Sequence, residues 1–332
     1  MSRIAILGAG AWGTALAISL ARRGGHQLCL WSHSPALAEQ LNEGGENLAY
    51  LPGFILPVDV RITNDLPSAI FEADIILCVM PSQHLRDILT ELAPLFTSNQ
   101  VIVSASKGIE EKTFLRMSQV IASITDNPCV VFSGPSFAQE VAAGSPTAVV
   151  AAASNSRLAQ TIQREFSSPA LRVYTNDDPT GVELGGALKN VIALAAGVVH
   201  GLNLGHNSGA ALITRGIAEI TRLSVACGGR RQTLAGLAGI GDLVLTSTGA
   251  LSRNRSVGIE LGRGRQLDDI LSGMGGKVAE GVRSTAAALG LAARYDVEMP
   301  ITEQVDAILH HGKKPGDAIR DLMSRPGRDE HR

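Results

Sequence analysis

The feature that most constrains this chain is a glycine-rich turn placed between a strand and a helix near its start. Residues 3–7 (RIAIL) have the apolar pattern of a β-strand, GAGAWG follows, and residues 11–23 have the pattern of a helix. In this GxGxxG spacing Gly8 permits the tight turn, Gly10 lets the backbone approach a pyrophosphate, and Gly13 lets helix and strand pack closely. The motif alone could be an ordinary glycine-rich turn, but the order strand, turn, helix favours a dinucleotide-binding βαβ unit.

Further apolar runs of strand length continue through the first half of the chain. We predict strands at 28–31, 75–80, 101–104, 129–132, 148–152 and 172–174. Continuous apolar strands separated by helix-length segments are typical of a parallel sheet covered on both faces. Beyond these runs, helix-period segments dominate, at 184–200, 208–227 and 281–294. The sequence therefore predicts an α/β Rossmann-type domain with a mostly parallel sheet over residues 1–182, followed by an all-α domain over residues 183–332.

Charge and composition exclude several classes of partner. With 29 Lys plus Arg against 31 Asp plus Glu, the formal net charge is -2, so the chain has no overall basic field for a nucleic acid. The four cysteines lie far apart with no CxxC pair, which is typical of reduced thiols in the cytoplasm. No uninterrupted apolar run reaches the roughly 18 residues of a membrane span. We therefore expect a cytoplasmic protein with a small-molecule ligand.

The end of the second predicted strand bears on which dinucleotide is bound. In sites that prefer NAD, an Asp or Glu about 20 residues after the turn receives the ribose 2′-hydroxyl. Here residues 30–35 read LWSHSP, without a carboxylate that would repel a 2′-phosphate. We expect NADP(H) to be accepted, with His33 near the phosphate. The alternative is that His33 is merely an exposed loop residue.

Polar residues follow two of the predicted strands, at the edge where open α/β sheets bind ligands. Lys107 follows 101–104, and it is either a ligand contact or a solvated lysine at a strand end. Residues 133–140 (SGPSFAQE) follow 129–132, and their Gly, Pro and Ser could present N–H and hydroxyl donors to an oxygen-rich ligand. The alternative for this second segment is a turn with a helix N-cap.

Lys189 is the most informative residue of the second half. It lies in a predicted helix with glycines one turn earlier and apolar residues after it (ELGGALKNVIALAAG, residues 183–197). A lysine desolvated in this position would have its charged form disfavoured and could transfer a proton near neutral pH. A lysine whose stem covers apolar surface while its head stays in water explains the pattern equally well.

Two polar clusters follow further along the chain. Asp242 lies in a glycine-bounded turn, and residues 252–255 (SRNR) either offer an anion site or form a plain basic loop. We expect no metal centre, because the eight histidines show no HExxH pattern and no pairing with cysteine. The sequence also lacks a nucleophile elbow, since no GxSxG follows a strand.

Taken together, the motifs resemble one enzyme family over nearly the whole chain and in order. They are GAGAWGTALA at 8–17, SKGIE at 106–110, SGPSFAQEV at 133–141, PTAV at 146–149, ELGGALKNVIALAAG at 183–197, GLAGIGDLVLT at 236–246, SRNR at 252–255 and VAEGVRS at 278–284. This set is similar to bacterial NAD(P)-dependent glycerol-3-phosphate dehydrogenases. Many oxidoreductases share GxGxxG, whereas ELGGALKN combined with GIGDL and SRNR is specific.

The resemblance implies roles for individual residues. Lys189 matches the catalytic lysine, and Lys107 matches a lysine that contacts both substrate and cofactor. The other positions that match the substrate site are Gly134, Ser136, Asp242, Ser252, Arg253 and Asn254. The positions that match cofactor contacts outside the glycines are Ala11, Trp12, His33, Ala138, Arg253, Val278 and Glu280. The family commonly has Arg at the position of His33, so the strength of any NADP preference is an open point.

The implied reaction is the reduction of dihydroxyacetone phosphate to sn-glycerol 3-phosphate for glycerophospholipid synthesis, with NAD(P)H as hydride donor. Protonated Lys189 would donate to the carbonyl oxygen as hydride arrives. Asp242 would orient the lysine or a substrate hydroxyl, and Arg253 with Asn254 would hold the phosphate.

Two alternatives to this reaction stay open. One is a β-hydroxyacid dehydrogenase, which would act on carboxylates. The other is a non-catalytic NADP(H) sensor, which would need none of these catalytic side chains. The assembly is open as well, because the apolar helices of the second domain could form either a homodimer surface or the core.

Overall fold

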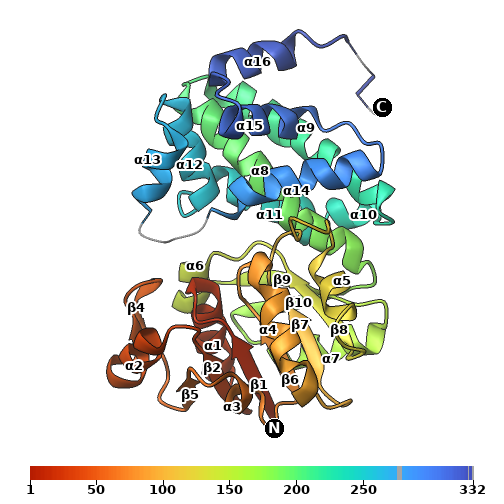
Figure 1. Cartoon of the computed structure of the whole chain (residues 1–332). Coiled ribbons are helices and arrows are strands. Elements are labelled where there is room, and N and C mark those ends of the chain that lie inside the picture. The colour runs from red at the N-terminus through yellow and green to blue at the C-terminus, as the bar shows by residue number, and fades with distance from the viewer. Residues whose placement is uncertain (275–278, 328, 331–332) are drawn as a thin grey trace.

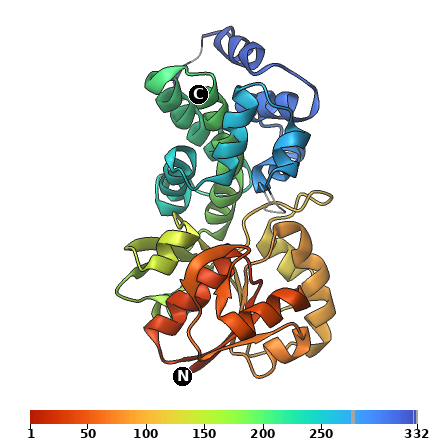
Figure 2. The same ribbon diagram turned by 90° about the vertical axis from the view of Figure 1, so that its left-hand side faces the viewer.

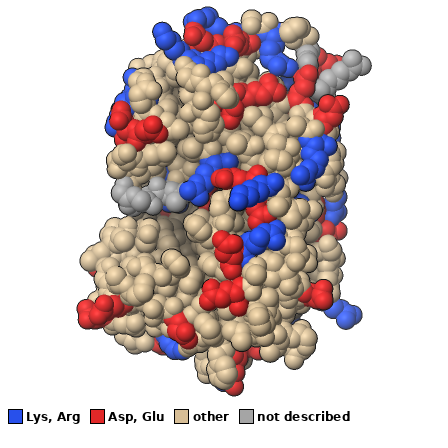
Figure 3. Space-filling model, viewed as in Figure 1, with Lys and Arg blue, Asp and Glu red and all other residues tan. Residues whose placement is uncertain are grey.

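The computed structural model describes residues 1–274, 279–327 and 329–330. Within these residues a sheet domain lies below a helical domain, and the two meet across the middle of the molecule (Figures 1 and 2). On the face drawn in Figure 3, acidic and basic side chains lie side by side where the domains meet. That face therefore carries no field of a single sign.

The sheet domain is built on one large sheet with the strand order β10-β9-β8-β7-β6-β1-β2-β5. Its strands are β1 (Ser2–Leu7), β2 (His26–Trp31), β5 (Val60–Thr63), β6 (Ile75–Cys78), β7 (Val101–Ser104), β8 (Cys129–Ser133), β9 (Thr147–Ala152) and β10 (Leu171–Asn176). Neighbouring strands pair in parallel, except that β8 and β9 pair antiparallel. The predicted Rossmann-type sheet, mostly parallel, is confirmed.

Three strands were not predicted from the sequence. These are the edge strand β5 and a small antiparallel hairpin of β3 (Glu46–Asn47) and β4 (Leu51–Ile55). The β4 sequence, LPGFI, contains Pro and Gly, which weaken a strand pattern. β5 is only four residues long and alternates apolar with polar residues (VRIT). Both are short strands outside the buried centre of the sheet.

Both faces of the sheet are covered by helices, as a parallel sheet requires. Along β1, Ile4 and Ile6 belong to one apolar cluster, while Ala5 and Leu7 belong to another on the opposite face. The helices of this domain are α1 (Ala11–Arg23), α2 (Pro35–Gly44), α3 (Leu66–Ile70), α4 (Leu85–Leu92), α5 (Met117–Ala122), α6 (Ala138–Ala143) and α7 (Ser156–Phe166). The alternation along β1 follows from the two-residue period of a strand.

The second domain is helical throughout its described residues. Its helices are α8 (Pro179–Gly201), α9 (Gly205–Ala226), α10 (Arg231–Leu234), α11 (Asp242–Thr248), α12 (Arg253–Gly262), α13 (Leu267–Ser272), α14 (Glu280–Arg294), α15 (Pro300–His310) and α16 (Pro315–Met323). A single π-helical turn, Leu237–Gly241, precedes α11 directly. The predicted all-α character of this domain is confirmed.

α8 forms the core of the helical domain and begins within the region where the two domains join. Its N-cap is Asp178, whose side chain accepts a hydrogen bond from the backbone N–H of Gly181 at 2.9 Å. α8 is long and apolar enough to cross a membrane, but its apolar stretch is entirely buried inside the protein, as expected for a core helix. The predicted domain boundary between residues 182 and 183 falls inside α8, and its placement stays a prediction.

Candidate active site

The glycine-rich turn joins β1 to α1 at the carboxyl edge of the sheet. Gly8 has φ +124, and a Cβ there would lie 2.9 Å from the carbonyl oxygen of Val79. A Cβ on Gly13 would lie 1.9 Å from the carbonyl oxygen of Gly8, whereas a Cβ on Gly10 would meet no atom within 4 Å. Gly10 is also the N-cap of α1 and supplies no side-chain hydrogen bond to the helix. The turn therefore presents open backbone at a helix N-terminus, which fits the pyrophosphate of a dinucleotide.

Asn47 fixes this turn, and nothing in the sequence pattern pointed to it. Its side chain is fully buried, and Nδ2 donates to the carbonyl oxygen of Ala9 and to Oγ1 of Thr14, both at 2.8 Å. Its Oδ1 accepts from the backbone N–H of Tyr50 at 3.1 Å. Asn47 thus ties the β3–β4 hairpin to the glycine-rich turn, across 38 residues of sequence.

Other residues expected to contact the cofactor lie around the same turn. Those packed against the apolar core of the sheet domain are Ala11, Trp12 and Ala138. The indole nitrogen of Trp12 is buried without a hydrogen-bond partner among the described residues, so it is a donor that an oxygen-rich ligand would satisfy. His33 follows β2 and is exposed, with its ring edge-on to Trp31 at 5.9 Å between centroids. Val278 lies outside the described residues.

Two lysines from different domains meet on one buried carboxylate. Lys189 of α8 donates through Nζ to Oδ1 of Asp242 at 2.6 Å and to Oγ1 of Thr246 at 2.7 Å. Lys107, in the loop after β7, donates to Oδ2 of the same carboxylate at 2.7 Å and to the carbonyl oxygen of Gly134 at 3.1 Å. Lys189 is only 6% exposed, which rules out a lysine that keeps its head in water. Of the two roles expected for Asp242, this contact fits the orientation of the lysine.

Burial and neighbouring charges shift the protonation equilibria of this cluster. Burial lowers the pKa of Lys189 to about 8; the charge of Asp242 opposes this shift, and the charge of Lys107 adds to it. Burial would raise the pKa of Asp242, but the two lysines hold it below its usual value. Burial raises the pKa of Glu280, against the opposing charges of Arg253 and both lysines. A lysine with this pKa can take up or release a proton near neutral pH.

Glycines on α8 explain why Lys189 lies so close to the sheet domain. A Cβ on Gly185 would lie 2.5 Å from the carbonyl oxygen of Ala238, and a Cβ on Gly186 would lie 2.6 Å from Oγ of Ser133. α8 can therefore approach both the π-helical turn and the end of β8. These are the small residues one helical turn before Lys189 that the sequence singled out.

The segment after β8 contributes polar groups beside Lys107. The carbonyl oxygen of Gly134 accepts from Lys107 and also from Oγ of Ser136 at 3.0 Å. Ser136 is not the N-cap of the helix that follows, because α6 begins at Ala138 and Phe137 is its N-cap residue. Gly134 and Ser136 thus lie beside Lys107, and their role as substrate contacts stays a prediction.

Asn254 joins three helices through its side-chain amide. Its Nδ2 donates to Oδ1 of Asn190 at 3.0 Å, and its Oδ1 accepts from the backbone N–H of Gly281 at 2.9 Å. Because Asn190 directly follows Lys189, this amide fixes the N-terminus of α12 beside the lysine. These contacts use one of the two N–H donors of Nδ2, and the expected contact of Asn254 with the substrate phosphate stays a prediction.

Arg253 begins α12 and is exposed, unlike its two neighbours. Ser252 is buried and caps the helix, with Oγ accepting from the backbone N–H of Arg255 at 3.2 Å. The charge of Arg253 acts on Glu280 at the start of α14. An exposed guanidinium beside a helix N-terminus is suited to an anion.

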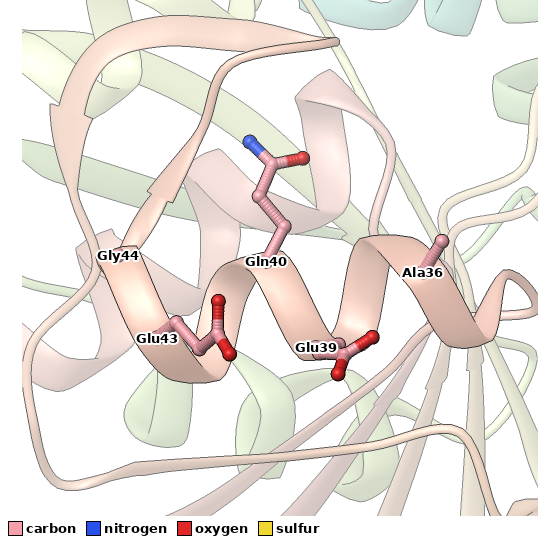
Figure 4. Close-up of a pocket in the computed structure, with 5 residues that line it drawn as sticks. All are labelled: Ala36, Glu39, Gln40, Glu43 and Gly44. Atoms are coloured by element: carbon pink, nitrogen blue, oxygen red, sulfur yellow. The ribbon is translucent and has the colours of Figure 1, made fainter.

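A shallow hollow on the surface is separate from this cluster. It lies along α2 and is lined by Ala36, Glu39, Gln40, Glu43 and Gly44 (Figure 4). Two of these side chains are carboxylates, which would repel an anionic ligand. Among the described residues, no three His, Cys, Asp or Glu side chains are grouped so that they could hold a metal ion.

The glycine-rich turn lies in the sheet domain, and the lysine cluster joins this domain to the helical domain at the carboxyl edge of one mostly parallel sheet. This architecture defines a nicotinamide-dependent dehydrogenase with a helical catalytic domain. The family model for the N-terminal domain of NAD-dependent glycerol-3-phosphate dehydrogenase matches residues 3–159, and the model for its C-terminal domain matches residues 178–320. The chain belongs to this family.

Individual relatives agree with this assignment over their full length. The chain is 60% identical to glycerol-3-phosphate dehydrogenase [NAD(P)+] of Acidobacterium capsulatum, covering 99% of this chain and 100% of that one. It is 58% identical to the protein of the same name in Koribacter versatilis, covering 99% of each chain. Among solved structures, the glycerol-3-phosphate dehydrogenase of Coxiella burnetii aligns with a TM-score of 0.94 at 41% identity, covering 98% of this chain and 99% of that one.

Proposed function

We propose that this chain is a glycerol-3-phosphate dehydrogenase that reduces dihydroxyacetone phosphate to sn-glycerol 3-phosphate with NAD(P)H, for glycerophospholipid synthesis. The observation that carries the proposal is the cluster of Lys189, Asp242 and Lys107 at the carboxyl edge of the sheet, built from both domains. A substrate bound between the glycine-rich turn and this cluster would meet a proton donor and a hydride donor together. The cofactor supplies a hydride from the nicotinamide ring when bound.

Lys189 is the proposed general acid. Its ammonium group donates a proton to the carbonyl oxygen at C2 of dihydroxyacetone phosphate as that carbon is reduced. In the oxidative direction the neutral amine removes the proton from the C2 hydroxyl. Asp242 holds Nζ in one place through its Oδ1, and Thr246 supplies the second hydrogen bond.

Cationic groups of both domains would bind the phosphate end of the substrate. Arg253 is exposed at the N-terminus of α12, where the free backbone N–H groups of the first turn add to its charge. Lys107 carries a second positive charge from the sheet domain, and its N–H groups would contact substrate and cofactor. A phosphorylated triose explains two cations beside an acid–base lysine, whereas a sensor needs no such lysine.

A spectrophotometric assay of NADPH and NADH oxidation with dihydroxyacetone phosphate tests the function. We expect turnover with this substrate and none with a 3-hydroxy acid in the reverse direction. Turnover on the 3-hydroxy acid alone would replace the proposal with a β-hydroxyacid dehydrogenase. Cofactor binding without oxidation across phosphorylated trioses would replace it with a sensor.

The proposal includes three finer points. The enzyme accepts NADP(H), because the end of β2 offers His33 and no carboxylate to the ribose. It works in the cytoplasm as a homodimer. Sedimentation velocity tests the dimer, and a single species at the chain mass of 34.7 kDa would exclude it.

A further inference from the structure

The connection between β7 and α5 belongs to the sheet domain by sequence but contributes to the core of the helical domain. Ile109 is fully buried within the apolar cluster of the helical domain, and Phe114 packs against the same cluster. In Figures 1 and 2 this connection rises from the sheet toward the helices above it. Lys107 lies in the same connection, shortly after β7. One segment therefore contains both an active-site lysine and the apolar side chains of Ile109 and Phe114 that contact the helical domain.

Phe114 is held in an unusual conformation at the tip of this connection. Its φ is +59, a value that a phenylalanine seldom adopts without support from its surroundings. The ring lies on α14, where a Cβ added to Gly290 would come within 2.2 Å of it. The guanidinium carbon of Arg294 lies 5.2 Å from the ring centroid, a cation–π contact. The ring therefore fills a space against α14 that is open because residue 290 has no side chain.

The same connection is fastened to the sheet domain on its other side. Glu110 forms a two-point ion pair with Arg86 of α4, with N–O distances of 2.8 and 2.9 Å. The carbonyl oxygen of Ile109 accepts from Nε2 of Gln83 at 2.9 Å. Just beyond the connection, Ser118 at the start of α5 donates through its backbone N–H to the carboxylate of Glu183 on α8 at 2.7 Å, which adds a tie to the helical domain. The connection is thus a clasp between the two domains, anchored on α4, α8 and α14.

We propose that Phe114 is a positioning residue for the reaction, because its ring anchors the clasp on α14 and thereby holds Lys107 against Asp242. The inference rests on the proposed function and deepens it. Lys107 and Asp242 come from different domains, and their contact requires that the segment after β7 keep its distance from α11. Without the ring, the Ile109–Phe114 stretch loses its contact with α14 and keeps only Ile109 in the helical core, so that Lys107 withdraws from the carboxylate.

The expected consequence is both geometric and electrostatic. The charged groups acting on Lys189 are Asp242 of α11, Lys107 of the clasp and Glu280 of α14. Of these, Lys107 is the one that lowers the pKa of Lys189 by its charge. Withdrawal of Lys107 therefore raises the pKa of Lys189 above about 8, and it also displaces a substrate contact. Displacement of a positioned group by about 1 Å can lower the rate by as much as a hundredfold.

Two variants disturb the anchor in different ways. Phe114→Ala removes the ring, and we expect kcat/KM for dihydroxyacetone phosphate to fall on the order of tenfold. Gly290→Ala keeps the ring but displaces it, because the new Cβ would occupy the space that the ring fills, while alanine is well tolerated in a helix. Both variants should move the high-pH decline of the reduction to higher pH. A purely structural role would lower activity without moving this pH profile.

The double variant Phe114→Ala/Gly290→Ala separates the anchor from other effects. Once the ring is gone, the added methyl group has nothing to displace, so the double variant should match Phe114→Ala within about twofold. The matched control is Phe71→Ala, since Phe71 is 73% exposed at the end of α3. The inference is overturned if Phe114→Ala keeps the parental kcat/KM and pH profile, or if Phe71→Ala changes them equally.

Hydrogen exchange decides the inference even without the assay. In Phe114→Ala the backbone amides of residues 107–114 should exchange faster, while those of α1 keep the parental rate. Unchanged exchange in the clasp would overturn the inference. If the parental protein does not reduce dihydroxyacetone phosphate at all, the proposed function fails, and exchange alone then decides whether Phe114 anchors Lys107.

Discussion

Lys107 and Asp242 form an ion pair between the sheet domain and the helical domain, with Nζ 2.7 Å from Oδ2. The other oxygen of the carboxylate accepts from Lys189 at 2.6 Å, so one buried anion lies between two cations. Removing either lysine leaves the carboxylate paired, whereas removing the carboxylate leaves two like charges facing each other. This asymmetry determines what substitution of each residue is expected to do.

Lys189→Ala should remove the proton donor while the protein stays folded, because Asp242 keeps its ion pair with Lys107. General acid–base catalysis is typically worth about 10²- to 10⁴-fold, so kcat for dihydroxyacetone phosphate should fall by about that factor. The measurement is steady-state kinetics alongside a thermal melt. Lys189→Arg is the matched control for charge, since arginine keeps the cation but does not give up its proton. If either variant retains near-parental turnover, Lys189 is not the acid.

The pH dependence of the two directions should be opposite. Reduction needs protonated Lys189, whose pKa is about 8, so kcat/KM for reduction should fall as the pH rises through about 8. Oxidation needs the neutral amine, so kcat/KM for glycerol 3-phosphate should rise over the same range. Initial rates measured in both directions from pH 6 to 10 check this, with about one pH unit of tolerance. Parallel profiles in the two directions would contradict the assignment.

Asp242→Asn should harm both stability and catalysis. The carboxylate raises the pKa of Lys189, so its loss should lower that pKa and move the decline of the reduction below about pH 8. Removing one partner of a buried ion pair typically costs about 3 kcal/mol of unfolding free energy. Part of this cost disappears at a pH where Lys189 is neutral. Urea unfolding of parent and variant at pH 7 and pH 9 measures it, and an equal loss at both pH values would contradict the electrostatic cause.

His33 is exposed at the end of β2, where a ribose 2′-phosphate would lie. His33→Arg should strengthen NADPH binding relative to NADH, because a guanidinium forms charge-assisted hydrogen bonds with phosphate. We expect the ratio of the two KM values to change by about tenfold toward NADPH, and His33→Ala to shift it the other way. Equal ratios of the KM values in His33→Ala and the parent would remove His33 from the cofactor site.

Much of the sheet domain could be predicted, because its central strands are buried on both faces and read as continuous apolar runs. α1 was predicted at residues 11–23 and is observed at Ala11–Arg23, since glycines at positions 10 and 24 mark both of its ends. The hairpin with β4 was missed because its Pro and Gly mimic a turn. Local patterns report what a segment can form, and short edge strands carry too few residues to be distinguished from loops.

The site was harder to predict than the fold, because its contacts are distant in sequence. For Lys189 the sequence left a buried proton-transfer group and a partly solvated lysine equally open. The structure shows a buried lysine, held by a carboxylate 53 residues later, and its role as the acid stays a prediction. Asn254 was expected to hold a phosphate from its neighbours in SRNR, and the structure adds a contact that the sequence did not show, from its amide to Asn190 of α8. The glycines repeated every four residues on each helix could have indicated that α8 and α12 pack closely. Gly197 of α8 and Gly258 of α12 are in direct backbone contact.

Asn47 supplies the last prediction. Asn47→Ala removes the donor to the carbonyl oxygen of Ala9, which would stay buried without that hydrogen bond. A buried polar group without its partner costs about 1 to 3 kcal/mol. Among the described residues, the glycine-rich turn also loses the side-chain hydrogen bond that links it to β3. We expect a lower unfolding free energy by that amount and a KM for NADPH raised about fivefold or more, since the turn positions the cofactor rather than the proton donor. Asn42→Ala is the matched control, because Asn42 is exposed on α2. Should the KM for NADPH stay at the parental value while stability falls, Asn47 supports the fold alone and has no part in cofactor binding.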